Sequence, residues 1–293
     1  MIDILSYGYM QHVFLAAGLA SIVCGIIGSY IIVQQISAIS GGIAHATFGG
    51  VGLGYLMGFS PIAGAEGFAV LAAMIIGVLK EFAQQKVDML ISAVWAIGMA
   101  LGVLFVALTP RYVPDIESYL FGNILQVTNG DIVLAGCLAM MIITVVAVLY
   151  HPFLAVTFDE EYATVMNLPV KLLNILLLIL ISLTVIILIQ VVGIILVIAL
   201  LTLPAASCRM LTSRLGVMMI GSSGIATVDS FGGIVLSYFW SVPAGATITL
   251  TAAAVFLIVI GKQLYKKRGM NECLTPFLKE RTHNNRDHII NKK

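Results

Sequence analysis

Apolar runs of about twenty residues, the length that crosses the hydrocarbon core of a bilayer, recur along the whole of this chain. The 293 residues are 60% hydrophobic and only 10% charged, and their mean hydropathy is +1.07. A soluble domain carries about 25% charged residues. Only helices and closed barrels satisfy backbone groups inside lipid. The sequence therefore predicts an all-α polytopic transmembrane bundle of eight or nine spans.

The predicted spans are approximately 9–34, 41–58, 61–79, 90–108, 130–150, 170–189, 191–211, 215–239 and 242–262. The run 171–211 is about twice the length of one span, so we divide it near Gln190 to Gly193. Without that division the count is eight. Residues 1–265 form the predicted transmembrane domain, and 266–293 form a predicted polar cytoplasmic tail.

Basic residues fall in connections that nine spans would place on one side of the membrane, which predicts that this side is cytoplasmic. They are Lys80, Lys86, Lys171, Arg209, Arg214 and the run 266–268. Arg111, in the loop 109–129, is the one exception, and the other basic residues outnumber it. The N-terminus is then outside and the C-terminus inside. The net charge of +1 comes without a basic patch, so no nucleic-acid partner is expected.

The second predicted span carries small residues every fourth position, a pattern that lets two helix backbones approach closely. This row consists of Gly42, Ala46, Gly50, Gly54 and Gly58. His45 lies on the neighbouring row between Gly41 and Gly49, so no bulky side chain of its own row crowds the imidazole. An ionisable group at this depth is costly and normally faces the bundle interior or a water-filled path.

Neutral imidazole is the commonest transition-metal ligand in proteins, so His45 is a candidate metal ligand. The alternative is a structural histidine that donates one hydrogen bond to a neighbouring helix. Two carboxylates could complete a site: Asp229, mid-way along the eighth span, and Glu66, early in the third. Asp229 could instead make a structural hydrogen bond, and Glu66 could lie in an outer vestibule or at the interface.

The segment 151–174 is too short and too amphipathic to span the membrane. Asp159 and Glu160 suit the first turn of a helix, and Pro169 suits its end. We expect a short helix across the cytoplasmic face; the alternative is a solvated connection.

Other motifs narrow the function. The sequence contains no G-x-x-x-x-G-K-[ST] phosphate loop, and it contains no H-E-x-x-H pair of the kind that an intramembrane enzyme would need. The cysteines lack the spacing of a metal or disulfide framework. A secondary transporter would show paired broken helices, and the second half does not repeat the His45 segment. His283 and His288 in the tail could bind metal, but a disordered polar tail is expected.

Five stretches together resemble the permease of the divalent-metal ABC importers, the family that takes up zinc, manganese or iron in bacteria and archaea. They are 25–58, 116–132, 157–170, 190–211 with its Leu-Pro-Ala-Ala turn, and 242–250. The resemblance implies a type II importer fold and a homodimer in the cytoplasmic membrane, with the path at the two-fold axis. It also implies a cytoplasmic ATPase dimer that uses ATP, an extracellular metal-binding protein, and no cofactor bound by this chain.

The resemblance also assigns residues. It implies that 157–170 docks into the ATPase through Phe158, Glu160, Glu161, Tyr162 and Ala163. Family members commonly carry an aspartate four residues before the histidine, but this chain has Gly41 there. His45 then stands alone or with Asp229 and Glu66, a set that suits zinc, manganese and ferrous iron equally. The nearest alternative is a permease for cobalamin or an iron-siderophore, although those chains are usually longer.

Overall fold

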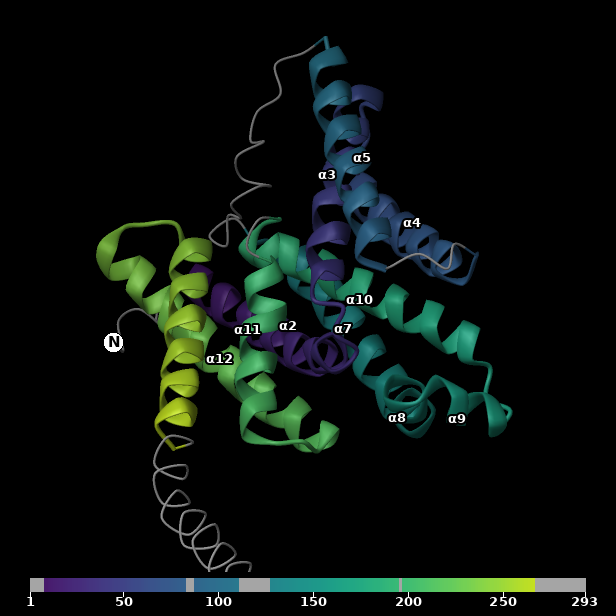
Figure 1. Ribbon diagram of the computed structural model, residues 1–293. Helices are drawn as coiled ribbons and strands as arrows, with labels where there is room; N and C mark the ends of the chain where they lie inside the picture. The colour runs from purple at the N-terminus through teal and green to yellow at the C-terminus, as the bar shows by residue number, and fades with distance from the viewer. Residues whose placement is uncertain (1–7, 83–86, 111–126, 195–196, 267–293) are drawn as a thin grey trace, which may run out of the picture.

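The computed structural model describes residues 8–82, 87–110, 127–194 and 197–266, and every regular element within these ranges is a helix (Figure 1). The first four are α2 (Gly8–Val33), α3 (Ala38–Met57), α4 (Pro61–Phe82) and α5 (Val87–Leu108). After them come α7 (Asn129–Val148), α8 (Tyr150–Phe158), α9 (Glu160–Val165), α10 (Val170–Val192), α11 (Val197–Leu211) and α12 (Leu215–Trp240). The C-terminal helix covers Ala244–Lys266.

A helix is present at each predicted span, so the all-α membrane fold is confirmed. The division of 171–211 is also confirmed: α10 ends at Val192, and Gly193 takes a positive φ of 85° before α11 begins. Within the described ranges, seven helices are long and apolar enough to cross a membrane. The helices at the other two predicted spans, α3 and α11, do not meet both the length and the hydropathy of a membrane span, each for its own reason. In α3, glycines and His45 lower the hydropathy, and α11 has only 15 residues.

The helices pack in two groups. Helix α2 packs against α12, α11 and α7, whereas α3 packs against α4 and α5. Helix α10 contacts members of both groups, including α4 and α2. Figure 1 shows α3, α4 and α5 together, apart from α12 and the C-terminal helix. The predicted His45 and Asp229 therefore belong to different groups.

The row of small residues on α3 lies against backbone. A methyl group added at Gly50 would overlap the backbone of Gly64 in α4, and one at Gly54 would come within 2.7 Å of Pro61 Cα. On α5, a methyl group at Gly98 would overlap Ala46. These close approaches leave no room for larger side chains.

Gly58 departs from the predicted row. It takes a φ of 78° and caps the end of α3, and a methyl group there would meet no atom within 4 Å. Its role is therefore conformational, because a left-handed residue at a helix end favours glycine, and it does not pack against another helix.

Several helix ends that carry the predicted cytoplasmic residues meet at one end of the bundle. Lys80 at the end of α4 pairs with Glu160 in α9. Gln34, just after α2, donates a hydrogen bond of 3.3 Å to Thr157 in α8. Near the other group, Gln263 of the C-terminal helix donates to the carbonyl of Met210. Which membrane face this end occupies stays a prediction.

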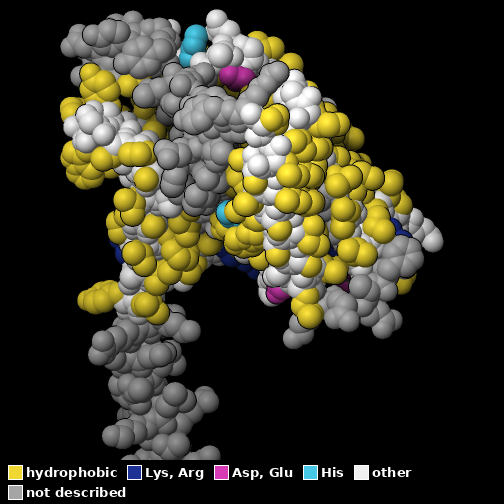
Figure 2. Space-filling view, turned by 90° about the horizontal axis from the view of Figure 1, so that it is seen from above, with side chains coloured by type: hydrophobic (Ala, Val, Ile, Leu, Met, Phe, Trp, Pro, Cys, Tyr) yellow, Lys and Arg dark blue, Asp and Glu magenta, His cyan; other side chains and the backbone are white. Residues whose placement is uncertain are grey.

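Hydrophobic side chains dominate the described part of the face in Figure 2, and charged side chains are few there. Several outward-facing residues of α5, α7 and α12 are more than half exposed, among them Ile97, Met140 and Val228. Such a surface is suited to lipid. The tail beyond Lys266, with His283 and His288, lies outside the described residues, so the domain division at 265 stays a prediction.

Candidate functional site

His45 stacks flat against the indole of Trp95 in α5. The ring centroids are 4.4 Å apart and the planes differ by 5°. The imidazole is half-buried, and its Nδ1 atom is fully buried with no hydrogen-bond partner in the described structure. The stack fixes the plane of the ring and leaves one ring nitrogen without a partner.

The position before His45 on the same helix face is closed by apolar side chains. A methyl group at Gly41 would overlap Ile198 of α11 and would lie 3.8 Å from Cζ3 of Trp95. An aspartate at this position would require Ile198 to move. The space that a carboxylate would need beside His45 is thus filled by the isoleucine and the indole.

Asp229 is buried in α12, where only 1% of its surface is exposed. Neither of its carboxylate oxygens has a hydrogen-bond partner among the described residues. Hydroxyl groups nearby bond elsewhere: Thr251 donates to the backbone carbonyl of Asp229 at 2.8 Å, and Ser21 donates to Ser230 at 2.9 Å. A buried carboxylate without partners carries a high desolvation cost.

The three candidate ligands do not form one site within the chain. His45 lies in the α3–α4–α5 group and Asp229 in the α2–α11–α12 group. Glu66 is half-buried in α4. Phe68 of the same helix lies close to Gly49 of α3. Since Glu66 precedes Phe68, it lies nearer to the turn that joins α3 and α4. Across the described ranges, no group of three or more His, Cys, Asp or Glu side chains could hold a metal ion.

The predicted amphipathic segment forms two helices instead of one. Asp159 adopts an extended conformation between α8 and α9, and its side chain accepts a hydrogen bond of 2.9 Å from the backbone of Tyr162. This N-cap ends α8 and starts α9. Helix α9 ends at Val165, before Pro169, because Asn167 takes a φ of 56° and the chain turns there.

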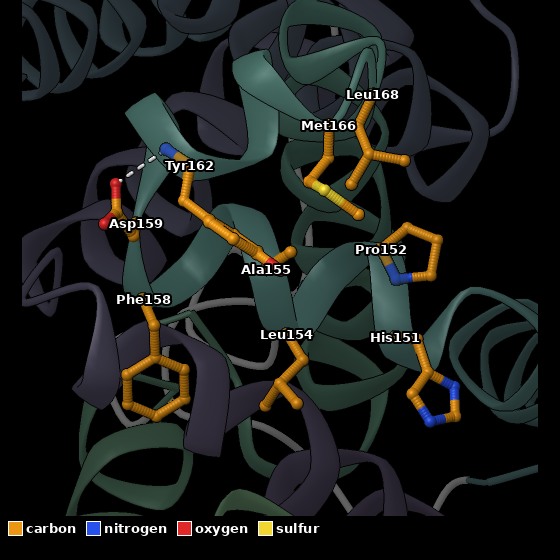
Figure 3. Close-up of a pocket in the computed structure, with 9 residues that line it drawn as sticks. All are labelled: His151, Pro152, Leu154, Ala155, Phe158, Asp159, Tyr162, Met166 and Leu168. Carbon is orange, nitrogen blue, oxygen red and sulfur yellow. Dashed lines mark hydrogen bonds between the residues drawn. The ribbon is translucent and has the colours of Figure 1, made fainter.

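A groove of about 660 Å³ lies between α8 and α9. Figure 3 shows side chains from both helices surrounding it, with Tyr162 and Met166 on the α9 side and Leu154 and Phe158 on the α8 side. Phe158 and Tyr162 are 53% and 55% exposed, respectively. The groove is therefore an open, largely apolar surface with aromatic walls.

The residues implied as ATPase contacts divide into outward and inward groups. Phe158, Glu160, Glu161 and Tyr162 are exposed. Ala163 is fully buried in the core under α9, so it supports the helix and presents no surface to a partner. Glu160 bonds within the chain: its Oε1 accepts from Lys80 Nζ at 3.1 Å and from Asn174 Nδ2 at 3.0 Å.

Three residues next to the candidate site were beyond the reach of sequence reasoning. Trp95 and Ile198 surround His45 and Gly41 but come from α5 and α11. Asn174 is buried in α10 and bonds to Glu160. A lone tryptophan or asparagine in an apolar segment carries no motif, so no local signal could have found them.

Comparisons with known proteins find matches over most of the chain. The profile of the ABC 3 transport family matches residues 6–263. An uncharacterized membrane protein of Synechocystis sp. is 43% identical over 258 residues, which cover 88% of this chain and 92% of that protein. The manganese transport system membrane protein MntC of Listeria innocua is 33% identical over 255 residues, covering 87% and 91%.

A solved structure is also similar. PsaBC from Streptococcus pneumoniae in complex with Fab superposes with a TM-score of 0.79 at 32% identity, over 88% of this chain and 93% of the matched chain. The fold and the sequence are thus both similar over most of the chain.

Proposed function

Since the chain belongs to the ABC 3 transport family and is the membrane permease of an ATP-driven divalent-metal importer, we propose that its cargo is manganese and that His45 contacts the ion. The chain is a multi-pass membrane protein of a bacterial metal transporter and is not itself an enzyme. The manganese proposal is supported by relatives named for manganese transport. Zinc and ferrous iron remain the ions to compare, because imidazole and carboxylate ligands accept all three.

The buried Nδ1 of His45 is the observation that supports a role in ion contact. Buried polar atoms are nearly always hydrogen-bonded, and each exception calls for an explanation. Here the unpaired nitrogen leaves one ligating position of the imidazole unused. A single neutral imidazole holds a divalent ion weakly, which suits a path that the ion must leave.

We extend the proposal to the other subunits of the transporter. We propose that two copies of the permease line the path and that a cytoplasmic ATPase dimer docks at the groove between α8 and α9. An extracellular binding protein delivers the metal. This arrangement places the N-terminus outside and the C-terminus in the cytoplasm, in agreement with the distribution of basic residues.

The test is ATP-dependent uptake in proteoliposomes that contain the permease, its ATPase and its binding protein. Wild type should import Mn²⁺ in preference to Zn²⁺ and Fe²⁺. His45→Ala should reduce uptake at least about tenfold, because a transient ligand is lost, while the complex still assembles and hydrolyses ATP.

His12→Ala is the matched control, since His12 is also a half-buried histidine but lies in α2, outside the α3–α4–α5 group. Normal uptake by His45→Ala would mean that His45 is a packing residue. Uptake of zinc in preference to manganese by wild type would overturn the proposed cargo.

A further inference from the structure

Glu160 joins α9 to two long helices of the bundle. Its Oε1 atom accepts a hydrogen bond from Lys80, near the end of α4, and another from Asn174, near the start of α10. Asn174 is only 7% exposed, so this partner is held in place by its surroundings. One oxygen atom therefore fixes the first turn of α9 against both helices.

The helices that hold Glu160 are themselves closely packed at this level. A methyl group at Gly77 in α4 would lie 3.1 Å from Leu178 and 3.2 Å from Ile175, both in α10. Lys80 follows Gly77 by about one turn, and Asn174 precedes Ile175 directly. The two hydrogen-bond donors are thus carried by one packed pair of helices.

The same α4 helix reaches the helix of His45. Gly64 in α4 approaches Gly50 in α3 so closely that a methyl group on either would overlap the other backbone. Gly64 and Lys80 lie about 24 Å apart on α4, and His45 lies about 7.5 Å along α3 from Gly50, at about 1.5 Å per residue. A packed helix connects the α9 end of the bundle to the His45 region.

We propose that Lys80 and Asn174 are positioning residues that make α9 move together with α4 and α10. Movement of the ATPase docked at α8 and α9 then reaches α3 and His45 through the Glu160 bonds. This inference rests on the proposed docking of the ATPase at α8 and α9. It assigns Glu160 to transmission within the permease instead of contact with the ATPase.

The exposure of the ion pair makes the inference testable. The Lys80 and Glu160 side chains are 32% and 50% exposed, and exposed ion pairs contribute little to folding stability. Their removal should leave the permease folded and assembled. A change in the coupling of ATP hydrolysis to transport can then be separated from a loss of structure.

The experiment measures Mn²⁺ imported per ATP hydrolysed by the complete transporter in proteoliposomes, with co-purification of the ATPase measured in parallel. Lys80→Glu and Glu160→Lys are compared with the exchanged pair Lys80→Glu/Glu160→Lys. Lys262→Glu, a charge reversal near the end of the C-terminal helix, is the matched control.

Each single reversal should lower the import ratio at least about threefold with normal ATPase binding, and the exchanged pair should restore at least half of that loss. The amide of Asn174 can turn its oxygen toward a lysine, so it does not prevent this rescue. Asn174→Leu keeps the side-chain size, removes the donor, and should lower the ratio without any charge reversal.

An unchanged ratio in all single variants would overturn the inference. So would an exchanged pair as impaired as the single variants, or an equal loss in Lys262→Glu. Loss of ATPase co-purification in Glu160→Lys that Lys80→Glu does not share would also overturn it, because Glu160 would then contact the ATPase. Failure of the proposed function is distinct: wild type itself would import no Mn²⁺.

Discussion

His45 and Asp229 both place an ionisable side chain inside an apolar bundle, but their surroundings differ. His45 rests on the face of Trp95, and the position beside it is closed by Ile198 and the indole. Asp229 has no such support, and both of its oxygens are buried without a hydrogen-bond partner among the described residues. The histidine is positioned by neighbours, whereas the carboxylate lowers the stability of its surroundings.

Replacing Asp229 should therefore stabilise the protein. We expect Asp229→Leu to raise the free energy of unfolding by about 1–3 kcal/mol, because it removes a buried polar group without partners. The measurement is the thermal unfolding midpoint of the purified permease in detergent. Manganese uptake by the same variant shows whether the carboxylate is retained for transport.

Ser230→Ala is the control for this experiment, since the Ser230 hydroxyl has a hydrogen-bond partner in Ser21. Its removal should lower the midpoint slightly. A lower midpoint for Asp229→Leu would mean that the carboxylate is stabilised in the assembled protein. Lost uptake together with a raised midpoint would assign Asp229 to the transport path.

Helix α3 is held in the bundle by close contact of its backbone with the backbones of α4 and α5, more than by large side chains. Its glycines meet Gly64 and Pro61 of α4 and Gly102 of α5. Close backbone contact replaces the hydrophobic driving force that helices lack inside lipid. A single added methyl group should then separate helices that carry the candidate ion contact.

Gly50→Ala should lower the stability by about 1–3 kcal/mol, because the methyl group overlaps the Gly64 backbone and neither helix can yield locally. Gly67→Ala in α4 is the matched change, because no atom of the described residues lies within 4 Å of the added group. It should be neutral or stabilise by up to about 1 kcal/mol through helix propensity. Thermal midpoints of both variants decide the comparison; equal midpoints would contradict close packing at Gly50.

At the scale of the whole molecule, the groove between α8 and α9 faces outward while Glu160 and Ala163 hold α9 to the bundle. The exposed aromatic side chains of Phe158 and Tyr162 thus lie on a helix pair that Glu160 and Ala163 attach to the bundle. An ATPase that binds these aromatic side chains would transmit its movement to the bundle through α9, as ATP-driven transport requires.

Phe158→Ser and Tyr162→Ser together should weaken ATPase co-purification at least about tenfold, because exposed aromatic side chains are frequent anchors of interfaces. Val165→Ser is the control: Val165 is 78% exposed on α9 but does not line the groove. The unfolding midpoint of the permease alone should stay unchanged in the double variant and in the control. Full ATPase recovery with the double variant would exclude the groove as the docking site.

The order and approximate bounds of the long helices could be read from the chain, because span length and hydropathy are local properties. The predicted count of eight or nine spans differs from the seven helices within the described ranges that are long and apolar enough to cross a membrane. The break near Gly193 was also accessible, since a run of twice the required length must be divided. The two consecutive helices α8 and α9 were only partly predictable from the sequence. Asp159 and Glu160, expected in a first turn, and Pro169 suggested a helix there. The structure shows instead that Asp159 is the N-cap, which ends one helix and begins another.

What surrounds each functional residue was decided by tertiary structure alone. Trp95 under His45, Lys80 and Asn174 on Glu160, and the separation of His45 from Asp229 all depend on which helices pack together. Helix packing sets contacts between residues far apart in the chain, and a local apolar pattern does not specify its partner helix. The hydropathy pattern predicts a membrane bundle that contains a histidine, whereas the packing of the helices sets which residues His45 and α9 contact.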